Sequence, residues 1–65
     1  MSYTIALDAM GGDHGLSVVI PAAFMQLEKD PNLKIILVGE QSTIQNYLQQ
    51  HAKKIPDVLT IHHAS

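Results

Sequence analysis

Residues 3–15, YTIALDAMGGDHG, place a glycine-rich and acidic turn directly after a run of β-formers. The first five of these residues are mostly β-branched, aromatic or apolar, which is typical of a strand. From Leu16 onward the apolar residues recur at helical spacing, so the stretch predicts a strand, a sharp turn and then a helix. Ligands on open parallel sheets bind beyond the carboxyl ends of the strands, which is where this turn is expected to lie.

The start of the predicted helix is less regular than its end. Ser17 is a suitable N-cap, but Pro21 would then lie inside the helix and remove a backbone donor. The helix therefore begins either near Leu16 with an irregular first turn or near Ile20. The run Asp30-Pro31-Asn32 is a strong breaker and predicts its end.

The rest of the chain continues the alternation of strands and helices. Residues 34–38 are apolar on both faces, which predicts a strand covered by helices on both sides, and Thr4 and Ala6 give the first strand a small, helix-accepting face. Ser42 and Gln45 form a capping-box pattern for a second helix that ends before Pro56, and residues 58–62 predict a third strand. The order predicts an α/β fold, β-α-β-α-β, with a parallel sheet in a Rossmann-like three-layer arrangement and no boundary within residues 1–65.

Composition narrows the class of protein. The chain has 65 residues, 46% of them hydrophobic and 15% charged, which predicts a folded chain with a core small enough to need a partner or further sequence. Its net charge is −2 and its four lysines are dispersed, which argues against nucleic-acid binding. There is no cysteine, no apolar run long enough to span a membrane and no basic leader, so we expect a cytoplasmic location.

The glycines of the turn suit an anionic ligand. They allow backbone N–H groups to face a ligand, and the N-terminus of the following helix adds partial positive charge. Phosphate or another oxyanion is therefore the expected ligand. The turn does not match a P-loop, because no lysine precedes Lys29. Of the dinucleotide-binding motif G-x-G-x-x-G it contains only the second half, Gly12-x-x-Gly15. The alternative is that the glycines only make a sharp turn. Asp8 and Asp13 are expected either to hold the turn by accepting backbone N–H groups or to orient an uncharged part of a substrate.

Of the histidines, His14 in the turn is a candidate donor to an oxyanion, with a solvent-exposed loop histidine as the alternative. His62 and His63 point to opposite faces of a strand, and no spacing resembles a metal site. The candidate substrate-binding residues are Asp8, Met10, Gly11, Gly12, Asp13 and His14, with Gly39 and His63 at the edge of the site.

Four motifs together resemble one family. ALDAMGGDHG at 6–15, VVIPAA at 18–23, LVGE at 37–40 and IHHAS at 61–65 are similar to the N-terminal part of the bacterial phosphate acyltransferases of phospholipid synthesis. Many members have Ala-Pro or Gly-Pro where this chain has Gly15-Leu16, and often Gly-Asp where it has Gly39-Glu40. Members are much longer, so the resemblance implies that residues 1–65 are the N-terminal segment of a larger α/β acyltransferase domain.

The resemblance also implies an activity. Members transfer a fatty acyl group from acyl carrier protein to inorganic phosphate to give acyl phosphate, without a cofactor, and are dimers that associate loosely with the membrane surface. Phosphate is already a nucleophile and a thiolate is a fair leaving group, so amides around Gly11 and Gly12 that position phosphate and an oxyanion suffice for this chemistry. A nucleotide- or phosphate-binding α/β module and a non-catalytic segment that needs a partner remain alternatives at this point.

Overall fold

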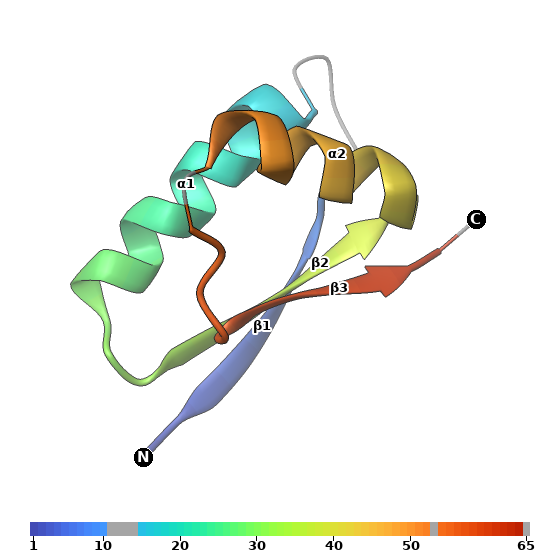
Figure 1. The fold of residues 1–65 in the computed structure, drawn as a ribbon. Helices are drawn as coiled ribbons and strands as arrows, with labels where there is room; N and C mark the ends of the chain where they lie inside the picture. Colours follow the sequence, from blue (N-terminus) through green and yellow to red (C-terminus); the bar gives the residue numbers. More distant parts are fainter. Residues whose placement is uncertain (11–14, 53, 65) are drawn as a thin grey trace.

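A computed structural model describes residues 1–10, 15–52 and 54–64, and these form three parallel strands and two helices (Figure 1). Along the chain the elements are β1 (Tyr3–Asp8), α1 (Leu16–Lys29), β2 (Leu33–Gly39), α2 (Gln41–His51) and β3 (Leu59–His63). The predicted β-α-β-α-β order and the parallel sheet are confirmed, and each predicted strand is found within one residue of its expected start.

The strand order is β1-β2-β3, so β2 lies in the centre of the sheet. The register pairs Asp8 of β1 with Val38 of β2, and Val38 in turn with His62 of β3. Because all three strands run in the same direction, their carboxyl ends form one edge of the sheet, which we call the rim.

Both helices cover the same face of the sheet (Figure 1). Two crossovers that advance in the same direction across a sheet and share the usual right hand bring their helices to one side. The alternation in β2 agrees, because Ile35 and Leu37 are buried whereas Lys34 is exposed and Ile36 half-buried. Among the described residues no helix covers the side of Thr4 and Ala6, so this segment forms two of the three layers expected for the larger domain.

The core lies between this face and the two helices. Helix α1 contributes Ile20 and Ala23, and α2 contributes Ile44 and Leu48 at the predicted helical spacing. The remaining buried apolar residues are Ala9, Leu33, Ile35, Leu37 and Leu59.

Helix α1 begins at Leu16, with Gly15 as its N-cap at φ 50°. Ser17 lies inside the helix, so its predicted role as N-cap is wrong, as is a start near Ile20. A glycine adopts this positive φ without a steric penalty. Gly15 can therefore act as the N-cap without a side-chain hydroxyl, and the helix begins at Leu16, one residue before Ser17. Pro21 lies in the helix interior, as the earlier start requires.

The other end of α1 is joined to the start of β1. Asp30, the C-cap, accepts a hydrogen bond from the backbone N–H of Asn32 at 3.0 Å and another from the hydroxyl of Tyr3. These hydrogen bonds, the one from Tyr3 first, lower the pKa of Asp30, and the same contact raises the pKa of the Tyr3 phenol. The predicted break at residues 30–32 is confirmed.

Candidate functional site

The rim brings together the ends of β1, β2 and β3, and with them four of the predicted site residues. Asp8 ends β1, Gly39 ends β2 and His63 ends β3, where Gly39 and His63 are paired in register. Met10 follows β1 by two residues. The backbone N–H of Ala64 donates to the carbonyl of Gly39 at 2.8 Å, which extends the pairing of β2 and β3 past the last strand residue.

Asp8 holds the turn that leaves β1. Its Oδ1 accepts a hydrogen bond from the backbone N–H of Met10 at 3.0 Å, the local pattern typical of an aspartate at a turn. The first of the two roles expected for Asp8, fixing the loop through a backbone N–H, is confirmed.

The same contacts decide which amides a ligand can use. The N–H of Ala9 donates to the carbonyl of Val38 at 2.9 Å, and the N–H of Met10 is bonded to Asp8. Both amides are therefore already bonded within the protein, whereas the amides of Gly11 and Gly12, which carry the expectation, lie outside the described residues.

Glu40 caps helix α2. Its Oε2 accepts from the backbone N–H of Thr43 at 2.6 Å, and the hydroxyl of Ser42 donates to Oε1 at 2.6 Å. The predicted capping box of Ser42 and Gln45 is therefore wrong. Glu40 is the N-cap, and its carboxylate accepts the hydrogen bond from a first-turn amide of the helix. The hydrogen bonds from Ser42 and Thr43, with a smaller contribution from the nearby His63, lower the pKa of Glu40 to about 2. Glu40 is negatively charged at neutral pH.

This cap predicts a pH-dependent contribution to stability. The pKa of Glu40 falls from 4.5 to about 2 on folding, so its contribution is complete above pH 4.5 and is lost as the pH falls through 2. We expect Glu40→Gln to lower the urea midpoint of the chain at neutral pH, with the difference from wild type closing as the pH approaches 2. Glu28→Gln, on the exposed side of α1, is the control and should not lower the midpoint. A gap between wild type and Glu40→Gln that stays constant with pH would contradict the capping role.

His63 lies beside the same helix start. Its Nδ1 accepts a hydrogen bond from the backbone N–H of Gln41 at 3.1 Å. The first-turn amides of Gln41 and Thr43 are thus both occupied by side chains of this chain. With a carboxylate at its N-cap, the start of α2 is not a site for phosphate.

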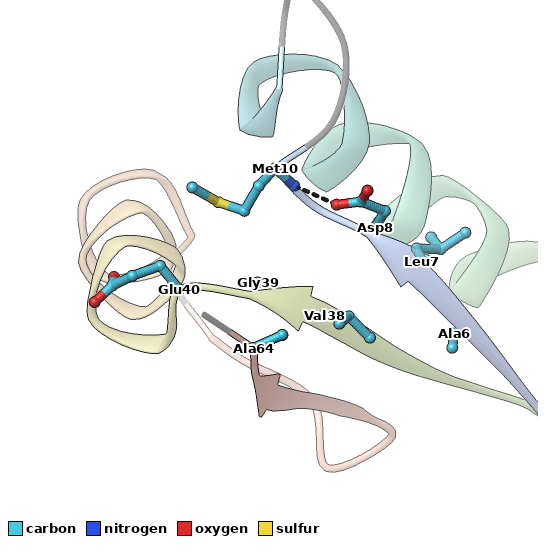
Figure 2. Close-up of a pocket in the computed structure, with 8 residues that line it drawn as sticks. All are labelled: Ala6, Leu7, Asp8, Met10, Val38, Gly39, Glu40 and Ala64. Carbon is cyan, nitrogen blue, oxygen red and sulfur yellow. Dashed lines mark hydrogen bonds between the residues drawn. The ribbon is translucent and has the colours of Figure 1, made fainter.

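A cavity of about 580 Å³ opens at the rim between β1 and β2 (Figure 2). Small-molecule sites commonly measure roughly 300–1,000 Å³, so its size fits a substrate. The lining residues are Ala6, Leu7, Asp8, Met10, Val38, Gly39, Glu40 and Ala64. His63 does not line it, but borders an adjoining hollow of about 310 Å³ that shares Glu40 with the cavity.

The structure thus gathers three of the predicted site residues, Asp8, Met10 and Gly39, around one cavity and places His63 beside it. The predicted residues Gly11, Gly12, Asp13 and His14 lie outside the described residues. Glu40 was missed, although an acidic residue directly after a strand that ends in glycine is a usable signal for a cap at the rim. Ala6 and Val38 carry no such signal, because their role depends on which face of the sheet stays uncovered.

No group of three or more metal-ligating side chains gathers among residues 1–10, 15–52 and 54–64. Over the same part of the chain, neither helix is long and apolar enough to cross a membrane.

Comparison with known families decides the relationship. The model of a family described as "Fatty acid synthesis protein" matches residues 3–65, which is nearly the whole chain and includes all described residues of the rim. The chain belongs to this fatty acid synthesis protein family.

Relatives within the family agree with this assignment. A protein of Methylococcus capsulatus named phosphate acyltransferase is 53% identical over 62 residues, which cover 95% of this chain and 18% of the relative. A phosphate acyltransferase of Francisella tularensis is 48% identical over 71 residues, covering 100% of this chain and 20% of the relative. The chain spans about a fifth of the length of these family members.

Proposed function

We propose that the full-length protein is a phosphate acyltransferase of phospholipid synthesis, which moves a fatty acyl group from acyl carrier protein to inorganic phosphate. The observation that carries this proposal is the family match over residues 3–65, together with relatives named phosphate acyltransferase that align with at least 95% of the chain. Residues 1–65 then form the N-terminal segment of a larger α/β domain.

The reaction makes modest demands on the protein. A phosphate oxygen attacks the thioester carbonyl carbon, a C–O bond forms, and the C–S bond breaks as the thiolate of the carrier leaves. Neither a covalent protein intermediate nor a strong base is needed, because the nucleophile is already anionic and the leaving group is stable. The protein must hold phosphate against the carbonyl and stabilise the oxyanion that develops there.

The turn between β1 and α1 is our candidate for this task. Asp8 fixes the start of this turn by accepting a hydrogen bond from the backbone N–H of Met10. The backbone N–H of Ala9 donates to the carbonyl of Val38, so neither amide is free for a ligand. The amides of Gly11 and Gly12, with the side chain of His14, are the donors that we assign to phosphate and the oxyanion. Asp13 is assigned to the conformation of this turn. All four residues lie outside the described part of the chain, so this assignment rests on the sequence and on the position of the turn at the rim.

Acyl carrier protein, inorganic phosphate and acyl phosphate are the partners in this proposal, and no cofactor takes part. The finer expectations are that the full-length protein is a cytoplasmic homodimer that contacts the inner face of the membrane peripherally. Analytical sedimentation of the full-length protein measures whether it is a dimer. Flotation with phospholipid vesicles measures whether it binds a membrane surface. A monomer, or a protein that stays unbound by vesicles, would contradict the respective expectation.

An enzymatic assay tests the proposed activity. The full-length protein is incubated with acyl carrier protein carrying a fatty acyl thioester and with ¹⁸O-labelled phosphate. We expect acyl phosphate that retains the label, together with an equal amount of free carrier thiol. Saturable binding of an adenine nucleotide without acyl phosphate would instead favour a nucleotide-binding module. Neither activity nor nucleotide binding would favour a non-catalytic role.

A further inference from the structure

The cavity at the rim has a mostly apolar lining, which a phosphate-binding pocket would not need. Ala6, Leu7, Met10, Val38 and Ala64 present hydrocarbon or thioether groups, and Gly39 contributes backbone (Figure 2). Such a lining with a few polar groups at one end is typical of a pocket for an apolar ligand.

The two charged residues of the lining have the wrong sign for phosphate. Asp8 is at the end of β1 and Glu40 at the start of α2, and the latter is ionised at neutral pH because its pKa is about 2. Carboxylates repel an anion within a few ångström, and the first-turn amides beside Glu40 already have partners. The uncharged part of a substrate is therefore the better occupant of this cavity.

Met10 forms one wall of the cavity and is seated on Gly39. Its side chain extends from the end of β1 across the end of β2 toward α2 (Figure 2). A Cβ added at Gly39 would collide with Cγ of Met10 and would lie 3.2 Å from its Sδ and 3.1 Å from Cδ1 of Ile44. The glycine thus makes room for the methionine, whose side chain still keeps 46% of its surface exposed. A flexible thioether in this position adjusts to the shape of what it contacts.

We propose that this cavity binds the first carbons of the acyl chain, next to the reacting carbonyl, and that Met10, seated on Gly39, determines which acyl chains are accepted. This inference rests on the proposed function and adds an apolar subsite on the β1–β2 side of the rim, separate from the anion donors assigned to the glycine turn. Gly39 acts as a positioning residue, because it acts on the substrate through Met10.

The first test compares acyl substrates in the full-length protein. Two acyl thioesters of acyl carrier protein are used, one unbranched and one with a methyl branch close to the carbonyl. A single methyl group in a hydrophobic pocket changes kcat/KM by roughly tenfold or more. Met10→Ala widens the cavity and should raise the branched-to-unbranched ratio of kcat/KM by about tenfold, whereas Met10→Leu, similar in volume, should keep the wild-type ratio. Gly39→Ala displaces Met10 into the cavity and should lower the ratio, and the KM for phosphate should stay unchanged in all variants.

Met25→Ala is the matched control, because Met25 lies on α1 with 53% of its surface exposed and lines no part of the cavity. Gly39→Ala can also disturb Ile44 in the core, so Met10→Ala, which truncates a half-exposed side chain, is the deciding variant. An unchanged ratio in folded Met10→Ala, or a change in the KM for phosphate with no change in acyl preference, would overturn the subsite.

A binding measurement separates this inference from the proposed activity. A fluorescent long-chain fatty acid is titrated into the full-length protein, and its affinity is compared between wild type, Met10→Ala and Met25→Ala. A loss of affinity of several-fold in Met10→Ala alone supports the subsite, even if wild type forms no acyl phosphate and the proposed activity fails. No binding to wild type, or equal binding to Met10→Ala, overturns the subsite even if acyl phosphate is formed.

Discussion

Gly12→Val in the full-length protein should lower the rate of acyl-phosphate formation by roughly a hundred- to a thousandfold, the usual effect of losing one oxyanion donor. The amides of Ala9 and Met10 are bonded to Val38 and Asp8, so we assign the anion donors of this turn to the glycines that follow. Valine keeps the backbone N–H, but its β-branched side chain restricts the backbone conformations that a glycine can adopt and adds bulk beside the proposed phosphate site.

The assay of Gly12→Val measures kcat and the KM for phosphate at saturating acyl carrier protein thioester. Far-UV circular dichroism must show unchanged helix content, and Val18→Ala, on the exposed side of α1, should retain full activity. A folded Gly12→Val protein with wild-type turnover would refute the role of the glycine turn, but it would leave the family membership intact.

The second large effect concerns the core. Ile44→Ala should lower the free energy of unfolding of the chain by roughly 2–5 kcal/mol, because Ile44 is fully buried between α2 and the sheet. Alanine is the better helix former, so the loss would come from packing and not from the helix itself.

Ile55→Ala is the matched control for this substitution, since Ile55 keeps 41% of its surface exposed. It should cost about 1 kcal/mol or less in urea unfolding followed by circular dichroism. Equal losses for Ile44→Ala and Ile55→Ala would contradict the placement of the core. The same experiment shows whether residues 1–65 fold without further sequence, because a chain of this size has little stability to lose.

Much of the fold follows from local patterns. The β-formers before the glycine turn and the apolar run at residues 34–38 predict β1 and β2, because alternation and β-branching act within a few residues. The helix starts were predicted less well. At α1 the positive φ of Gly15 allows the helix to begin before Ser17, and at α2 the longer side chain of Glu40 replaces the expected cap of Ser42.

What the sequence could not predict depends on contacts between strands. Apolar residues on both faces of β2 suggested helices on both sides, but the direction of the two crossovers places both helices on one. The turn held by Asp8 was expected, because it is a local interaction. The packing of Met10 against Gly39 was not expected, because these residues are far apart in sequence and come together only through the pairing of β1 with β2.

The most direct test of the acyl site at the rim uses the methionines as reporters. The full-length protein is prepared with ¹³C-labelled methionine methyl groups and titrated with a long-chain acyl phosphate. We predict a saturable change in the NMR signal of Met10, which borders the cavity, and none in that of Met25 on α1. Saturable binding of acyl phosphate that leaves the Met10 signal unchanged would place the acyl group elsewhere and contradict this account.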